Sequence, residues 1–328
     1  MTPAASPLPP FKSIRYTGAA PGPRLIVTAA VHGNEVCGTR AIARLMGELD
    51  AGRVAIVAGS VTLVPITNPK ADVLGRRAGD RNLNRALQPS AAPREFEDHV
   101  ANWLCPLLAQ HDMLLDLHSF QAQGQPFVML GPNDNAGAIE PFAQAAGEEA
   151  LVRCLGVRRA VDGWRATYAA GVARRTVAAE VDGRSGTLDL HPRYGVGTTE
   201  YMRSVGGWAL TLECGQHDDP QSPETAYRAI RNSLAHLGLC DEPPPPQVAS
   251  IESLSLHEVV DKVHAGDAFS RPWQSFDALR AGELIGTRAN GEPVRAPHDG
   301  RIVFPNALAQ PRQEWFYLAR PNQRFGRA

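Results

Sequence analysis

Three apolar segments of this sequence each end in a side chain that can hold a metal ion or carry a proton. The first, Leu25–Val31, runs directly into His32, and Glu35 follows three residues later. The other two end in His118 and in Glu213. Two imidazoles and a carboxylate are a ligand set typical of catalytic zinc, which keeps one coordination position open. A further carboxylate beside such a metal can take a proton from water and return it, so these residues predict a metal-dependent hydrolase.

Each of these residues also has a structural interpretation when it is taken alone. The His32–Glu35 pair can arise by chance or through helix capping, and His118 can be a hydrogen-bonded core histidine. Glu213 is harder to explain in this way, because burying a carboxylate without a partner is costly. The metal hypothesis therefore depends on a fold that brings all four side chains together.

The surrounding elements predict a fold that brings these side chains together. Apolar runs at 25–31, 113–117 and 209–212 are typical of buried strands. Helical spacing occurs between and after them, at about 35–49, 93–108, 136–151 and 222–237. Alternating strands and helices predict an α/β fold, with a mostly parallel central sheet flanked by helices. Sites in such folds lie beyond the carboxyl ends of the strands, where the three segments end.

Composition narrows the class of protein. The chain has 328 residues, 43% of them hydrophobic, and a formal net charge of −1, which favours neither nucleic acid nor an anionic membrane surface. No apolar run approaches the ~18 residues of a membrane span. Five scattered cysteines without a C-x-x-C pair favour reduced thiols. We expect a cytoplasmic protein without nucleic-acid or membrane partners, and a homo-oligomer is compatible with the sequence.

A proline run provides the clearest candidate for a domain boundary. Residues 241–246 read Asp-Glu followed by four prolines, which form a stiff spacer. Short extended segments with turn signals follow it. We therefore predict a catalytic α/β domain over residues 1–243, in which residues 1–12 form a flexible arm, and a small β-domain over residues 244–328. Residues 157–197 match no pattern that assigns them a role.

Five short motifs, in order, resemble the succinylglutamate desuccinylase and aspartoacylase family of zinc amidohydrolases. The resemblance covers roughly residues 24–240. The motifs are His32-Gly33-Asn34-Glu35, Thr67-Asn68-Pro69, Asn82-Leu83-Asn84-Arg85, Asp116-Leu117-His118 and Leu212-Glu213-Cys214-Gly215. The resemblance implies a carboxypeptidase-like α/β fold and a C-terminal β-domain that narrows access to the metal.

The resemblance also implies roles for the residues that carry the chemistry. It assigns one zinc ion (Zn2+) per chain to His32, Glu35 and His118. Glu213 falls at the position of the general acid–base, and Arg77 at that of the arginine which polarises the scissile carbonyl.

Three further residues match positions that bind substrate in the family. Asn84 and Arg85 match the pair that holds the α-carboxylate, and Arg203 matches the arginine that contacts a second carboxylate in aspartoacylase. One departure lies next to this pair: Asn82 stands where the family usually has aspartate, which leaves the orientation of its loop open.

The function implied is zinc-dependent hydrolysis of an N-acyl amino acid or a similar small amide, which releases a carboxylate and a free amine. A metallocarboxypeptidase acting on short peptides is the alternative, and a non-catalytic zinc-binding relative is a third. The sequence identifies neither the acyl group nor the amino acid.

Overall fold

The computed structural model describes residues 10–181 and 188–326. Most of the expected arm, residues 1–12, lies outside the described residues. The strands are β1 (Ile14–Thr17), β2 (Ala20–Ala29), β3 (Ala58–Val64), β4 (Met113–Phe120), β5 (Phe127–Met129), β6 (Arg159–Asp162), β7 (Trp208–Gln216), β8 (Glu252–Asp261), β9 (Ala268–Phe269), β10 (Ala278–Leu279), β11 (Leu284–Thr287), β12 (Pro293–Arg295), β13 (Gly300–Val303) and β14 (Glu314–Pro321). The helices are α1 (Cys37–Asp50), α2 (Pro69–Leu74), α3 (Phe96–Leu108), α4 (Ala145–Val152), α5 (Trp164–Val181), α6 (Thr198–Ser204) and α7 (Ser222–His236), with a 3₁₀ turn at Leu188–Leu190.

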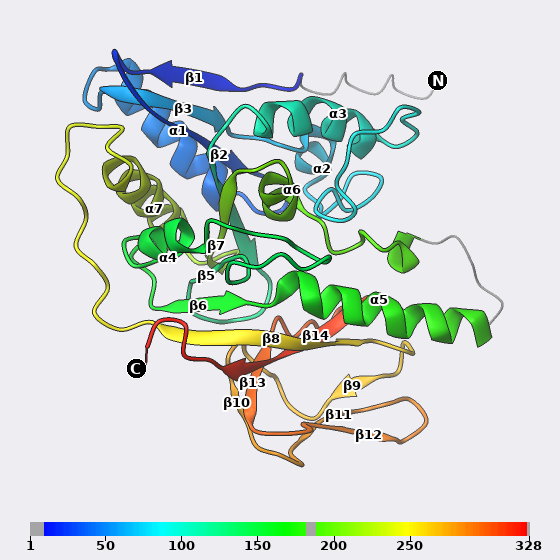
Figure 1. Cartoon of the computed structure of the whole chain (residues 1–328). Helices are drawn as coiled ribbons and strands as arrows, with labels where there is room; N and C mark the ends of the chain where they lie inside the picture. The colour runs from blue at the N-terminus through cyan, green and yellow to red at the C-terminus, as the bar shows by residue number, and fades with distance from the viewer. Residues whose placement is uncertain (1–9, 182–187, 327–328) are drawn as a thin grey trace.

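Most of the strands form one large sheet. Its order among the described residues is β1-β3-β2-β4-β7-β5-β6-β8-β14-β13-β10 (Figure 1). The pairs β3-β2, β2-β4, β4-β7, β5-β6 and β6-β8 are parallel. This confirms the predicted α/β fold with a mostly parallel central sheet, and antiparallel strands extend it toward the C-terminus.

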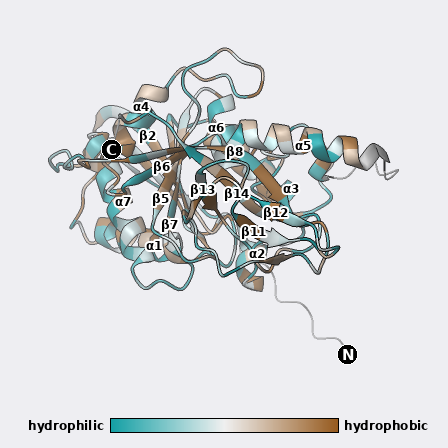
Figure 2. Cartoon of the chain, turned by 90° about the horizontal axis from the view of Figure 1, so that it is seen from below, coloured by the Kyte–Doolittle hydropathy of each residue, from teal (hydrophilic) through white to brown (hydrophobic). Residues whose placement is uncertain are grey.

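Alternation along the central strands explains why helices cover both faces of the sheet. Leu25 and Val27 of β2 pack in a core with residues of α1 and α7, whereas Ile26 packs with residues of α3 and α6. All eight residues of β4 are buried, as expected for a strand with helices on both sides. Apolar residues accordingly gather along the strands in the middle of the molecule (Figure 2). These buried strands form a rigid base for the side chains at their ends.

The C-terminal segment is joined to this sheet. Strand β8 pairs in parallel with β6, and β14 pairs antiparallel with β8. A separate small sheet has the order β12-β11-β9. The boundary between residues 243 and 244 stays a prediction. Removal of residues 244–328 would expose the edge of β6 that now pairs with β8.

Two regions differ from the sequence prediction or add to it. The helix expected at 136–151 begins only at Ala145, because Asn135 and Phe142 form an antiparallel bridge and Pro141 disfavours helix in the residue before it. The unassigned stretch 157–197 contains β6 and the 18-residue helix α5. Within it, residues 182–187 lie outside the described part.

Candidate metal and hydrolase site

The loop after β2 brings His32 and Glu35 to one point. Glu35 N donates to His32 O across a tight turn, 3.1 Å away. A side chain at Gly33 would come within 2.0 Å of the backbone of Ala71 in α2, so glycine is needed here for close packing of the two backbones. This packing against α2 holds the turn in place. The side chains of His32 and Glu35 both face the end of β4.

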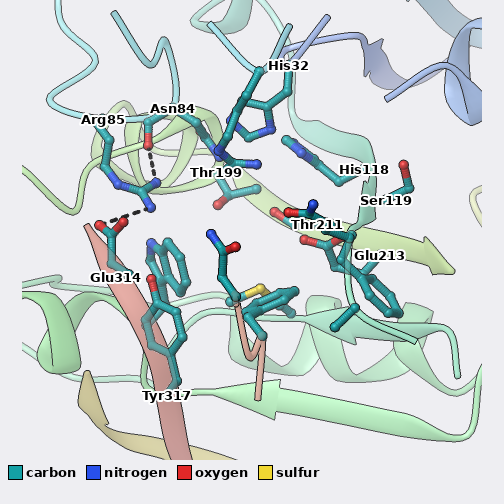
Figure 3. A pocket seen from close by; sticks show the side chains of 18 of the residues that line it. His32, Asn84, Arg85, His118, Ser119, Thr199, Thr211, Glu213, Glu314 and Tyr317 are labelled. Atoms are coloured by element: carbon teal, nitrogen blue, oxygen red, sulfur yellow. Dashed lines mark hydrogen bonds and ion pairs between the residues drawn. The ribbon is translucent and has the colours of Figure 1, made fainter. Parts of the chain in front are cut away.

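His118 completes the cluster from β4. Glu35 Oε1 lies 2.8 Å from His32 Nδ1, and Glu35 Oε2 lies 2.8 Å from His118 Nδ1. Ligand atoms of these three buried residues lie within 4.8 Å of one another. The predicted ligands are therefore brought together. Figure 3 shows the side chains of His32 and His118 next to each other.

The outward nitrogen of each imidazole is held by another side chain. Asp116 Oδ2 lies 2.8 Å from His118 Nε2, and Asn82 Oδ1 lies 3.0 Å from His32 Nε2. Such partners fix the ring orientation and the tautomer of metal-binding histidines. Asn82 Oδ1 also accepts a bond from Asn84 N at 2.9 Å, so the asparagine that departs from the family pattern still orders its loop.

The electrostatics of the two histidines differ. Burial lowers the pKa of His32 to about 4, with the nearby Arg77 adding to this effect. Burial acts on His118 as well, but the carboxylates of Asp116 and Glu35 on either side raise its pKa well above the ordinary value. The imidazoles in turn hold the pKa of Glu35 well below its usual range, although burial opposes this.

The donor set fits a zinc ion. Two imidazole nitrogens and one carboxylate, each with its ring or oxygen fixed by a neighbour, are the ligands of many catalytic zinc sites. His32, Glu35 and His118 would hold the ion beside a cavity. His32 and His118 line this cavity, whose volume is about 240 Å³.

Glu213 lies in the wall of the same cavity. It stands on β7 and is 8% exposed, and its Oε2 has no hydrogen-bond partner among the described residues. Burial raises its pKa to about 8, with Glu35 and Asp116 adding to the rise and His118 and Arg77 opposing it. A carboxyl group that exchanges a proton near neutral pH beside a metal site is suited to acid–base work.

Arg77 reaches the same cavity from the loop after α2. Its Nη1 donates to Glu35 Oε1 at 3.1 Å, while about half of the side chain stays exposed. Because the guanidinium lines the cavity, its remaining donors can reach a bound carbonyl oxygen.

Asn84 and Arg85 lie on another wall of the cavity. Asn84 Oδ1 accepts a bond from Thr198 N at 2.9 Å. Arg85 is buried and donates to Asn84 O and to the Tyr168 hydroxyl, at 2.8 and 2.6 Å. Its Nη2 lies 3.6 Å from Glu314, which reaches up from β14 (Figure 3).

Arg203 also lines the cavity, from α6. Each of its side-chain nitrogens is already bonded: Nε to Glu148, Nη1 to Glu140 and Nη2 to Ala209 O, at 2.8, 3.0 and 2.7 Å. The cavity thus brings together every predicted catalytic and substrate-binding residue, but each side-chain nitrogen of Arg203 already donates a hydrogen bond within the protein.

Several cavity residues have no signal in the sequence. Phe304, Glu314 and Tyr317 come from the C-terminal segment, and Trp164 from the unassigned stretch. Their roles depend on long-range pairing of β8 and β14, which no local motif reveals.

His217 is a further cavity residue that none of the sequence motifs includes. The ring lines the cavity, with Nδ1 2.8 Å from Ser119 Oγ and Nε2 3.3 Å from Asn34. Both partners are chain neighbours of metal-ligand positions. The spacing of His217, four residues after Glu213, was the only available hint.

The fold and the cluster define an α/β protein with a His–Glu–His site of the kind that can bind a metal ion. Comparison with known proteins identifies its family. Residues 21–231 match the sequence model of the succinylglutamate desuccinylase/aspartoacylase catalytic domain. The match covers well over half of the chain, so the chain belongs to this family, whose members are deacylase hydrolases. No curated protein matches the sequence significantly.

Solved structures share the fold at low sequence identity. A succinylglutamate desuccinylase/aspartoacylase from Rhodobacter sphaeroides is 18% identical, with a TM-score of 0.69 over 95% of this chain and 90% of that one. The ectoine utilization protein EutE (DoeB) from Ruegeria pomeroyi, in a product-bound structure, is 18% identical, with a TM-score of 0.66 over 96% and 97%. An aspartoacylase family protein from Mesorhizobium loti is 19% identical, with a TM-score of 0.61 over 96% and 90%.

The remaining expectations concern membrane spans, the cysteines, the cellular location and the oligomeric state. In the described residues, no helix has the length and apolar character required to cross a membrane. All five cysteines are buried and unpaired. The cytoplasmic location and a homo-oligomer stay predictions.

Proposed function

We propose that this protein is a zinc-dependent amidohydrolase that cleaves the amide bond of an N-acyl amino acid or a similar small amide. The observation that carries the proposal is the position of Glu213: a buried carboxylate with an unpartnered oxygen, in the same cavity wall as His32 and His118. Neither a structural core nor a purely metal-storing site needs such a group, because its burial is costly.

The reaction replaces the amide C–N bond by a C–O bond from water. A zinc ion bound by His32, Glu35 and His118 would supply Lewis acidity to the carbonyl group and make water a stronger acid. Glu213 takes a proton from the attacking water and delivers it to the departing nitrogen, which is a poor leaving group without it. Arg77 donates to the carbonyl oxygen as negative charge develops there. The products are a carboxylate and an amine.

The remaining residues hold the substrate. Asn84 and Arg85 bind its α-carboxylate, a task suited to the planar fork of arginine. Glu314 and Tyr317 close the cavity on the side of β14 and restrict it to small substrates. Arg203 lines the cavity and influences which substrate charge is accepted there.

The test combines metal content and a substrate screen. The purified protein is stripped with a chelator, reloaded with zinc, and assayed on N-acetyl, N-succinyl and N-formyl amino acids and on short peptides. We expect one zinc per chain and zinc-dependent release of amine from the acyl amino acids. His118→Ala should lose the metal, whereas His264→Ala, at an exposed turn, should keep it. Full zinc content in His118→Ala, or cleavage of peptides alone, would contradict the proposal.

A further inference from the structure

The guanidinium of Arg203 is enclosed by carboxylates. Glu148 and Glu140 bond its Nε and Nη1, and Glu200 lies 3.5 Å from Nη1. We call these four residues the Arg203 cluster. The cluster is tightly fixed, because Glu148 also accepts from the backbone of Gly131 and Ala209. A side chain at Gly131 would come within 2.4 Å of Arg203 Nε, so Arg203 cannot easily swing away from these partners.

The Arg203 cluster carries an excess of negative charge. One guanidinium faces three carboxylates, which gives a net charge of −2 when all four groups are ionised. Arg165 is the next cation within electrostatic range of Glu140 and Glu200, but it donates to Pro192 O and is not among the described residues that line the cavity. Counting it still leaves a negative balance.

One carboxylate of the Arg203 cluster, Glu200, faces the cavity, whereas Glu140 and Glu148 are not among the described residues that line it. Arg203 and Glu200 both line it, beside Thr199 and Thr211, so a substrate group bound there is close to both signs of charge. Each side-chain nitrogen of Arg203 already donates one hydrogen bond within the protein, while the surplus carboxylate charge is not neutralised. A second substrate carboxylate would have to displace a buried ion pair and approach like charges.

Arg85 provides the contrast within the same cavity. It is 3% exposed, and its Nε has no hydrogen-bond partner among the described residues. One free buried donor is costly unless a ligand uses it. Arg85 lies beside one carboxylate, Glu314, whereas Arg203 lies among three, so the cavity favours a substrate carboxylate at Arg85 over one at Arg203.

Building on the proposed function, we infer that the Arg203 cluster makes this enzyme select N-acyl amino acids whose side chain is cationic or neutral and reject those with an acidic side chain. This reverses the role that the resemblance implied for Arg203, since its neighbours change the sign of the charge that the substrate meets. Glu200 and Glu140 are then the residues that determine specificity, and Arg203 is the residue that positions them.

The direct test compares three substrates of similar size. The acyl group is held at the one preferred in the screen, and the amino acid is ornithine, glutamine or glutamate. We expect kcat/KM for the glutamate derivative to be at least about tenfold below that for the glutamine derivative, and the ornithine derivative to be the best. A glutamate derivative that equals or exceeds the glutamine derivative would overturn the inference.

A variant tests the cause. Glu140→Gln removes one carboxylate from the Arg203 cluster and frees an Arg203 donor, so the ratio of ornithine to glutamate turnover should fall by about fivefold or more. Glu149→Gln is the matched control: it lies on the same loop–helix segment and pairs with Arg324, at 2.8 Å, outside the cavity. It should leave the ratio unchanged. An unchanged ratio in Glu140→Gln would count against the cluster as the source of selectivity.

Binding separates this inference from the proposed function. Calorimetry of free ornithine, glutamine and glutamate on the zinc-loaded protein reports the charge preference without any turnover. Absence of hydrolysis together with the order ornithine above glutamate would refute the proposed function and retain the inference. Hydrolysis with tightest binding of glutamate would do the reverse.

Discussion

His118 and Glu213 occupy facing positions on the neighbouring parallel strands β4 and β7. The register of one strand pair therefore sets the distance between a proposed metal ligand and the proposed acid–base carboxylate. Both strands are buried, with Leu114 and Leu115 aligned to Ala209 and Leu210, so a slip by one residue would turn apolar side chains into the cavity. The rigidity of this pairing supports a site in which proton transfer needs little reorganisation.

Glu213→Gln tests the acid–base role. The amide keeps the size of the side chain but cannot carry the proton, so turnover should fall by ~10²–10⁴ while zinc stays near one per chain. Metal is measured by elemental analysis, substrate affinity by calorimetry and turnover on the best substrate. Retained turnover in the zinc-loaded variant would mean that another group moves the proton.

Asn82→Ala tests the partner of His32. The change removes the acceptor for His32 Nε2 and for Asn84 N, so zinc affinity should fall by about 10–100-fold. Asn82→Asp restores the carboxylate usual in the family and should bind zinc at least as tightly as the native chain. Competition with a zinc-sensitive dye measures both, with Asn290→Ala in an exposed loop as the control. Equal affinity in all variants would exclude this role of Asn82.

The sequence was sufficient to predict the part of the site that depends on strand ends. His32, Glu35, His118 and Glu213 follow buried apolar runs, and parallel strands necessarily present such ends at one edge. Glu314 could not be found in this way, because its place in the cavity follows from the pairing of β14 with β8, between segments that no local pattern connects.

The carboxylates around Arg203 could not be predicted from the sequence either. A motif match identifies an arginine but not its neighbours, and Glu140 and Glu148 come from a loop and a helix more than fifty residues earlier in the chain. Their approach depends on the bridge between Asn135 and Phe142, in a stretch that sequence periodicity assigned to helix. On the inference above, tertiary contacts of this kind set the charge that a substrate meets.

Arg85 offers a test of carboxylate binding. Arg85→Ala should raise KM for all N-acyl amino acids, through the loss of ~2–4 kcal/mol of charge-assisted bonding. The same change removes the ion pair of Glu314 with Arg85, although the Tyr168 hydroxyl still donates to Glu314, and it should lower the thermal midpoint. Glu314→Gln, which keeps Arg85, separates the two effects. Calorimetry and steady-state kinetics measure them; an unchanged KM in folded Arg85→Ala would contradict the assignment.

His217 should support the metal ligands indirectly. It bonds to Ser119, which follows His118, and to Asn34, which precedes Glu35, so it ties the two ligand-bearing segments together. His217→Ala should weaken zinc binding by several-fold, less than Asn82→Ala, because no bond to a ligand itself is lost. His217→Gln should recover part of the loss. Zinc affinity unchanged in His217→Ala would show that the segments are held without it.

The charge state of Glu140 gives substrate preference a pH dependence. Burial raises the pKa of Glu140 to about 7, with Glu200 and Glu148 adding to the rise and Arg203 opposing it. Between pH 6 and pH 8 the carboxyl group therefore loses its proton, and the Arg203 cluster gains a negative charge. The ratio of ornithine to glutamate turnover should rise about fivefold to tenfold over this range, as expected for one charge near a partly screened subsite.

The raised pKa of Glu140 also affects folding stability. Because the folded state holds this proton more tightly than the unfolded one, stability is lost as the pH rises from the ordinary glutamate pKa through about 7, and the loss then levels off. Glu140→Gln removes the titrating group, so its substrate ratio should stay flat and its thermal midpoint should fall less between pH 6 and pH 8. Kinetics and thermal unfolding across this range, with Glu149→Gln as the control, measure both effects; a native ratio that does not change with pH would show that Glu140 does not act on the substrate.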